Sequence, residues 1–295
     1  MSHFSRRHFL KGALATTAVA STGSLAFGAK RAATDWVPLG TSGVKVTRLA
    51  FGTGTYGGRV QRELGQEEFT RLVRHAYDRG IRFFETADAY TGMPQMLGTA
   101  LKGIPRDSYR LMSKMRLRDA SNAVPTIDRL RKDLNTDYFD VLLLHCVRNP
   151  NWMEEYKPAR DAFSEAKVKK VLMAHGASCH GLLPLRAFPE NHWLDVALLR
   201  CNHKGTRMDT LQGGDGEELG DVPEVTSRIQ AVKTGHTGVI GMKLVGEGRF
   251  TTAEDRDKAM RHAFQVAKVD AATIGYKSTA EIDEAVERMG RVLNA

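Results

Sequence analysis

Four side chains capable of acid–base chemistry follow apolar runs of the kind that form buried strands. Glu85 and Tyr90 follow one run, Lys114 lies at the end of the next, and His145 follows the third. A lysine beside a tyrosine stabilises the phenolate and lowers the phenol pKa, and an acid beside the lysine keeps it charged and in place. The tyrosine can then donate a proton near neutral pH. These residues predict acid–base catalysis, with a hydrogen-bonded core residue as the alternative role for His145.

The elements that must position these residues alternate between strand and helix patterns eight times along the chain. The predicted strands are residues 48–54, 82–88, 109–115, 138–146, 170–177, 194–201, 237–244 and 271–276. The predicted helices are residues 67–79, 93–102, 121–134, 152–167, 181–188, 224–234, 253–268 and 279–293. Continuous apolar strands such as 141–144 are typical of parallel sheets, which are buried on both faces. The pattern predicts an α/β fold, a (β/α)8 TIM barrel, with an N-terminal β-hairpin over residues 36–47.

In such a barrel the active site lies at the C-terminal ends of the strands. Glu85, Tyr90, Lys114 and His145 all follow or end predicted strands, so we expect them to meet there. The longest segment without a periodic pattern is 203–223, after the sixth strand, and loops of that length often cover or bind ligands.

A doubly wound open sheet is the alternative fold, because residues 52–57 (Gly-Thr-Gly-Thr-Tyr-Gly) match the dinucleotide motif G-x-G-x-x-G. That motif needs its last glycine in the first turn of a helix, whose N-terminus binds the pyrophosphate. No helical pattern starts before about residue 67. We therefore interpret this stretch as a loop.

Several segments, in the order in which they occur, resemble the aldo-keto reductase family over residues 36–293. The similar segments are 39–54 (opening hairpin and first strand), 83–90 (family pattern F-F-D-T-A-D-x-Y), 137–145 (the strand with the family histidine), and 241–243 and 274–278 (the last two strand ends). The combined order is more specific than any one segment.

The resemblance implies a catalytic tetrad of Asp, Tyr, Lys and His. Tyr90, Lys114 and His145 match three of these positions, and Glu85 stands at the Asp position with one extra methylene. Asp88 matches a different Asp of the same segment. The implied reaction is hydride transfer from a nicotinamide to a carbonyl carbon, with Tyr90 protonating the alkoxide, Lys114 and Glu85 tuning it, and His145 orienting the carbonyl. A misplacement of about 1 Å can cost large factors in rate, so the geometry at Glu85 matters.

The resemblance also implies NAD(P)H as cofactor, held at further strand ends. The expected cofactor-binding residues are Gly52, Thr53, Gly54, Ser178, Cys179, Met242, Lys243, Lys277 and Ser278. Cys179 and Leu198 stand where the family has the Asn and Gln that face the carboxamide, and Met242 stands where many members have an aromatic ring. An arginine expected after Ser278 is replaced by Glu281 and Asp283, so selection for a 2′-phosphate should be weak.

Two other functions stay open from the sequence. A nicotinamide-binding sensor or redox protein with little turnover is favoured by the departures at the cofactor positions. A metal or redox site is suggested by Cys146, Cys179 and Cys201, which stand beside histidines at three successive strand ends. No C-x-x-C pair supports the second alternative, and buried cysteines pack well without a metal, so we predict no metal site.

The N-terminus is typical of an export signal. Residues 5–11 (Ser-Arg-Arg-His-Phe-Leu-Lys) match the twin-arginine pattern S-R-R-x-F-L-K, and small or apolar residues follow to position 27. The apolar stretch is too short and polar for a comfortable span of ~20 residues, so no stable membrane insertion is expected. We predict a signal peptide at 1–29, a barrel domain at 30–295, recognition by the twin-arginine export machinery, and a periplasmic or otherwise exported location in the bacterial cell envelope.

Composition agrees with one large globular domain or two ordinary ones. The 295 residues are 42% hydrophobic and 26% charged, which suffices for a large core and excludes collagen-like, disordered and disulfide-scaffold classes. Three cysteines cannot form a closed set of pairs. The net charge of +9 is not gathered in one basic stretch, so we expect no nucleic acid partner. The family resemblance implies a small-molecule carbonyl substrate.

Overall fold

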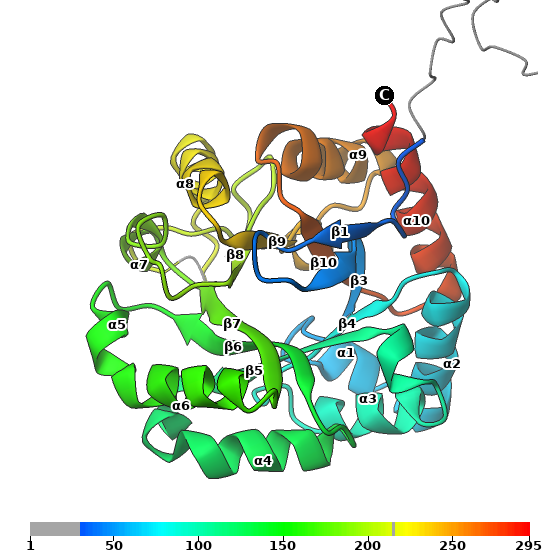
Figure 1. Ribbon diagram of the computed structural model, residues 1–295. Coiled ribbons are helices and arrows are strands. Elements are labelled where there is room, and N and C mark those ends of the chain that lie inside the picture. The colour runs from blue at the N-terminus through cyan, green and yellow to red at the C-terminus, as the bar shows by residue number, and fades with distance from the viewer. Residues whose placement is uncertain (1–29, 214–215) are drawn as a thin grey trace, which may run out of the picture. The chain divides into compact units, whose positions relative to one another are not determined.

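Parallel strands close into a barrel in the part of the chain that the computed structural model describes, residues 30–213 and 216–295 (Figure 1). In barrel order the strands are β3 (Leu49–Gly52), β4 (Phe83–Glu85), β5 (Arg110–Arg116), β6 (Phe139–Val147), β7 (Leu172–Cys179), β8 (Val196–Arg200), β9 (Gly238–Met242) and β10 (Ala271–Gly275), which pairs with β3. All eight predicted strands are found. The predicted (β/α)8 barrel is confirmed, and the doubly wound alternative is wrong. The predicted signal peptide lies outside the described residues.

Alternation along each strand decides which side chains face the barrel interior. Val141 and Leu143 of β6 belong to the inner cluster, whereas Leu142 and Leu144 pack outward against the helices. Position 145 therefore also faces inward, one step closer to the C-terminal end. The same alternation, followed along the other strands, brings a ring of inward positions together at that end.

The opposite end of the barrel is closed by the predicted hairpin, which consists of β1 (Trp36–Pro38) and β2 (Lys45–Thr47). Its apolar side chains, among them Val37 and Val46, are buried in the same cluster as the barrel interior. Gly40 bridges to Thr237, immediately before β9 begins, so the hairpin covers the N-terminal ends of the strands.

Helices surround the barrel (Figure 1). They are α1 (Arg59–Arg62), α2 (Gly65–Asp78), α3 (Met93–Leu101), α4 (Ala123–Asp133), α5 (Trp152–Glu155), α6 (Lys157–Val168), α7 (Leu182–Arg186), α8 (Val222–Thr234), α9 (Ala253–Arg261) and α10 (Thr279–Leu293). Each predicted helix is present, although the one at 152–167 is divided into α5 and α6, and the one at 253–268 continues after α9 as a π-helical turn. Side-chain oxygens of Asp221, Thr252 and Ser278 accept backbone N–H groups and determine where α8, α9 and α10 begin.

One prediction about the loop after β3 is wrong. Helix α1 begins at Arg59 and α2 at Gly65, earlier than the expected 67. Gly57 and Gly58 have φ angles of 66° and 86°, a left-handed conformation that glycine adopts without steric cost. These two residues turn the chain before α1 starts, so the last glycine of the motif does not lie in the first turn of a helix. The loop interpretation is confirmed.

Two glycines within helices provide a matched test of the packing. A Cβ at Gly98 in α3 would lie 2.8 Å from the backbone C and O of Leu134, whereas a Cβ at Gly290 in α10 would meet nothing within 4 Å. Gly290→Ala should raise the melting temperature, because alanine is favoured over glycine in a helix by ~1 kcal/mol. Gly98→Ala should lower it despite the same helical gain. Thermal unfolding followed by circular dichroism measures both, and equal shifts of the same sign would contradict the close packing of α3.

Candidate active site

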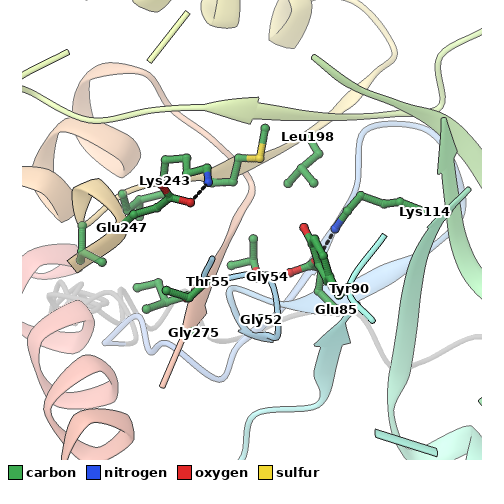
Figure 2. A pocket seen from close by; sticks show the side chains of 15 residues that line it. Gly52, Gly54, Thr55, Glu85, Tyr90, Lys114, Leu198, Lys243, Glu247 and Gly275 are labelled. Atoms are coloured by element: carbon green, nitrogen blue, oxygen red, sulfur yellow. Dashed lines mark hydrogen bonds and ion pairs between the residues drawn. The ribbon is translucent and has the colours of Figure 1, made fainter. Parts of the chain in front are cut away.

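A cavity lies at the C-terminal end of the barrel, where the inward positions of neighbouring strands meet (Figure 2). Its walls include Glu85, Tyr90 and Lys114 together with Leu198 from β8 and Thr273 from β10. The remaining lining residues are Gly52, Gly54, Thr55, Met242, Lys243, Leu244, Val245, Glu247, Ile274 and Gly275. The structure therefore brings three of the four predicted catalytic residues into one cavity wall.

The Lys114 ammonium and the Glu85 carboxylate form a buried ion pair at this wall. The two side chains are only 1% and 4% exposed. Oε1 of Glu85 contacts Lys114, and Oε2 accepts a hydrogen bond from the Thr273 hydroxyl at 3.2 Å. Gly52 makes room for this arrangement, since a Cβ there would lie 2.5 Å from the Thr273 hydroxyl oxygen and 3.0 Å from Oε2 of Glu85. Both oxygens of the longer acid are therefore engaged.

Tyr90 lies between this ion pair and His145. The Lys114 Nζ is 4.8 Å from the centroid of the Tyr90 ring, and the rings of Tyr90 and His145 meet edge to face with centroids 5.5 Å apart. The phenol also packs against Gly54, where a Cβ would lie 2.6 Å from the Tyr90 hydroxyl oxygen. His145 is not part of the cavity wall itself, but its ring contact places it beside the phenol.

Burial controls the protonation of these groups. It raises the pKa of Tyr90, and the electrostatic interactions with Cys146 and Glu247 raise it further. The expected lowering of the Tyr90 pKa by Lys114 is therefore wrong, because desolvation outweighs the cation. Burial also lowers the pKa of Lys114 and of His145, and the charge of Lys114 lowers that of His145 further. The tyrosine is thus protonated and the histidine neutral at ordinary pH.

Asp88 does not replace Glu85 as the partner of the lysine. Its carboxylate pairs with Arg129 on α4 at 3.0 Å and lies 3.9 Å from Arg116. This placement agrees with the alignment of Asp88 to the second acid of the segment.

A second cavity adjoins the first, and five residues line both: Thr55, Val245, Glu247, Ile274 and Gly275. Its walls carry the cations Lys277, Arg256 and Arg288. Between the two cavities the ammonium of Lys243 pairs with the carboxylate of Glu247 (Figure 2). The walls of the second cavity also carry Glu281 and Glu284, and Glu284 pairs with both arginines, so the charges of the second cavity are mixed.

The expected cofactor positions divide into two groups. Gly52, Gly54, Met242 and Lys243 line the first cavity, and Lys277 lines the second. Thr53, Ser178, Cys179 and Ser278 line neither cavity among those described. The Ser178 hydroxyl accepts the backbone N–H of Cys146 at 2.7 Å, and the Ser278 hydroxyl accepts the N–H of Glu281 at 3.3 Å.

Thr53 and Cys179, the other two expected residues that line neither cavity, make buried contacts. Thr53 donates to the hydroxyl of Thr86 at 3.0 Å, and the fully buried Cys179 thiol donates to the carbonyl of Gly181 at 3.4 Å. Burial raises the pKa of Cys179 well above its ordinary value, so this thiol remains protonated.

Thr273 and Glu247 are two of the lining residues to which the sequence alone gave no role. Thr273 faces inward on β10 in the same alternation as Ala271, and that pattern could have identified it. Glu247 lies four residues after Lys243 in a turn with left-handed φ angles at both residues, 61° and 54°. Its only signal in the sequence is an acid shortly after a lysine at a strand end.

The cysteines do not support a metal or disulfide site. Cys146, Cys179 and Cys201, all of them described, form no disulfide. Within the described residues no group of three or more His, Cys, Asp or Glu side chains is arranged to hold a metal ion.

Comparison with known proteins finds a family match over the first half of the barrel. Residues 48–169 match the model of the Aldo/keto reductase family. The predicted resemblance is confirmed. Residues 3–23 match the model of the TAT (twin-arginine translocation) pathway signal sequence. In the described part of the chain no helix is long and apolar enough to cross a membrane.

Individual relatives agree with this family. Probable aldo-keto reductase 1 from Glycine max is 27% identical over 172 residues, which cover 51% of this chain and 49% of the relative. The chain thus matches about half the length of that curated relative.

Solved structures confirm the fold over most of the barrel. A holo-form aldo-keto reductase from Bacillus halodurans has a TM-score of 0.66 at 18% identity, covering 88% of this chain and 95% of that one. An aldo/keto reductase from Klebsiella pneumoniae, solved with NADP and acetate, has a TM-score of 0.61 at 17% identity, covering 87% and 89%.

The buried ion pair provides a stability test. Lys114→Met leaves the Glu85 carboxylate buried without its cation, and breaking such a pair typically costs about 3–5 kcal/mol. Adding Glu85→Gln removes the unpaired charge, so the double variant should be more stable than Lys114→Met alone. Urea unfolding of the three proteins measures the difference. A double variant as unstable as the single one would contradict the electrostatic coupling between these two residues.

Proposed function

We propose that this protein is an NAD(P)H-dependent oxidoreductase that reduces an aldehyde or ketone to an alcohol, with Tyr90 as proton donor. The observation that carries the proposal is the placement of Tyr90 between the buried Lys114–Glu85 pair and the neutral His145. The family match over residues 48–169 supports the same reaction class.

In the proposed reaction each residue has one task. Tyr90, whose pKa is raised by burial, holds its proton until an alkoxide, a much stronger base, forms on the substrate. Lys114 stabilises the phenolate left behind, and Glu85 keeps the lysine charged and in position. His145 donates a hydrogen bond that orients the carbonyl. The bound nicotinamide supplies the hydride.

The residues around the two cavities fit a dinucleotide in shape and in part in charge. The cavities adjoin at their shared lining residues, and Gly275 preserves space, since a Cβ there would lie 2.5 Å from the Thr55 hydroxyl oxygen. We infer that Gly52, Gly54 and Met242 contact the nicotinamide half, and that Lys243 and Lys277 face the phosphates and the adenosine half.

The twin-arginine match indicates export, and we propose a periplasmic or otherwise envelope location in a bacterium. The twin-arginine route carries proteins that are already folded. The cofactor can therefore enter the site before export, while the chain is still in contact with the nicotinamide pool of the cytoplasm.

A second candidate is a nicotinamide-binding sensor or redox protein with little turnover. The observation that favours it is the chemistry around the expected carboxamide position, where Leu198 is apolar and the Ser178 hydroxyl is engaged with the N–H of Cys146. Fewer polar partners for the carboxamide mean a less firmly oriented ring.

Replacing the proton donor separates the two candidates. Tyr90→Phe removes the hydroxyl and retains the ring packing against Gly54 and His145, so folding and cofactor binding should change little. Carbonyl reduction should fall by ~10²–10⁴, the usual effect of losing a general acid. Reduction of a nitrobenzaldehyde, measured beside cofactor binding, gives the answer. Undiminished turnover in Tyr90→Phe, or wild-type protein that binds cofactor and reduces nothing, would favour the sensor function over the reductase.

The acid provides a more specific test of geometry. Because both oxygens of Glu85 are engaged, the backbone of this site is adapted to the longer side chain. Glu85→Asp should therefore lower the rate, by up to about 10²-fold, since a misplacement of about 1 Å is enough for such a loss. An increase in activity would show that the extra methylene misplaces the carboxylate.

Cofactor choice follows from the N-terminus of α10. The Glu281 carboxylate accepts the backbone N–H of Lys277 at 2.9 Å, and the Ser278 hydroxyl caps the helix. An anion thus already occupies the end of the helix that would attract a phosphate. NAD(H) should bind at least as well as NADP(H) in fluorescence titrations, and Glu281→Gln should shift the ratio towards NADP(H). A wild-type preference for NADP(H) of roughly tenfold, ~1.4 kcal/mol, would refute this expectation.

Export can be tested independently of catalysis. Replacing Arg6 and Arg7 with lysine should leave the unprocessed precursor in the cytoplasm, because the paired arginines form the core of the matched signal. Cell fractionation and immunoblotting detect precursor and mature protein. Unchanged export and processing would disprove the assigned route.

A further inference from the structure

A buried arginine lies in the same inward layer as the catalytic residues. Arg200 ends β8 and continues the inward series of Val196 and Leu198. Its side chain is 1% exposed, and a charge this deeply buried is costly unless it is well paired.

The contacts of Arg200 connect two loops at the mouth of the barrel, the one after β7 and the one after β8. Nη1 donates to the carbonyl of Gly213 at 2.7 Å and lies 3.5 Å from the Asp209 carboxylate. Nη2 lies 2.6 Å from Nδ1 of His180, the residue that follows β7. Asp209, itself fully buried, accepts the backbone N–H of Gly181 at 2.8 Å. The guanidinium therefore orients the loop after β7 relative to β8.

The contact with His180 determines the chemistry of that ring. A guanidinium has only donors, so Nδ1 of His180 must be the acceptor and cannot carry a proton. The proton of the neutral imidazole then resides on Nε2. Protonating Nδ1 as well would place two cations in direct contact.

His180 in turn contacts His145. The two rings meet edge to face, with centroids 6.5 Å apart and planes at 88°. His145 makes the same kind of contact with Tyr90 on its other side. His145 is thus held between two rings, and the orientation of one of them depends on Arg200.

The charged groups near His180 come from several elements. Arg200 lies on β8, and Asp209 lies in the loop that follows it. Arg148, after β6, lies near the same point, since a Cβ on Gly213 would be 3.4 Å from its Nη1 and 3.9 Å from the His180 carbonyl oxygen. His145 faces the ring itself.

We propose that Arg200 is a positioning residue that holds His180 as the neutral Nε2–H tautomer and, through the His180 ring, maintains the orientation of His145 towards the substrate carbonyl. The catalytic part of this inference rests on the proposed function. The tautomer part does not, because it concerns only the protein.

The tautomer can be observed directly by long-range ¹H–¹⁵N NMR of the histidine rings in the intact mature protein. His180→Gln identifies the His180 signals by their loss. In the wild type, Nδ1 should show the shift of an unprotonated nitrogen and Nε2 that of a protonated one, without titration between pH 5.5 and 8. A protonated Nδ1, or a ring that titrates in this range, would overturn the proposal.

Variants test the link to His145. In Arg200→Met the His180 signals should titrate or show both tautomers, and the kcat for carbonyl reduction should fall by about tenfold or more while the cofactor Kd stays within about twofold. Arg200→Lys, which keeps a cationic donor for Asp209, should recover part of the loss. Arg186→Met is the matched control, since Arg186 is exposed on α7 and pairs with Glu224 at 2.7 Å. It should change neither the NMR signals nor kcat.

The outcomes separate the two levels of inference. A kcat that is unchanged in Arg200→Met while His180 titrates would show that the arginine sets the tautomer without positioning His145, and the proposal would fail. A wild type with the expected tautomer but no reductase activity would refute the proposed function and leave the assigned tautomer standing. Where Arg200→Met does not fold, the wild-type spectra and Arg200→Lys still decide.

Discussion

The site depends on one buried ion pair, between Lys114 and Glu85. Two charges removed from water are costly unless each has a partner, so neither residue can be changed alone without leaving the other unpaired. The pair also places a positive charge 4.8 Å from the Tyr90 ring. Thr273 from β10, at the point where the barrel closes on β3, holds the second carboxylate oxygen. The pairing of β10 with β3 that closes the barrel therefore also brings Thr273 to Glu85.

Alternation along the strands extends this dependence to the rest of the interior. The apolar interior contains Phe83, Met112 and Val141. Glu85 lies two residues after Phe83 on β4, and Lys114 lies two residues after Met112 on β5. His145 lies four residues after Val141 on β6. The apolar layer thus excludes water from beneath the charged one. Because of this burial, Tyr90 retains its proton and His145 remains neutral. The same strands therefore carry the apolar core residues and, closer to their C-terminal ends, the acid–base residues.

Much of this arrangement could be predicted from the sequence. Apolar runs of strand length located all the barrel strands, and their last residues indicated Lys114 and His145. What the sequence could not show depends on contacts between distant segments. Ser178 matched a family position but binds the N–H of Cys146 at a β-bulge between β6 and β7. The pKa of Tyr90 was expected to fall because the lysine was apparent in the sequence, whereas the degree of burial was not. Arg200 was missed, although the alternation along β8 places it on the inward side with Val196 and Leu198.

The hairpin at the other end of the barrel has a consequence for how ligands pass in and out. With Val37 and Val46 packed into the interior, the hairpin fills the N-terminal end of the described barrel, and both described cavities lie among the loops at the C-terminal end. Everything that reaches Tyr90 or leaves it therefore crosses a single rim. Two ligands that use one entrance cannot exchange with solvent independently, since the outer ligand obstructs the inner one. The shared entrance then sets the order in which ligands bind, and loops that never touch the reacting atoms can limit the rate of turnover.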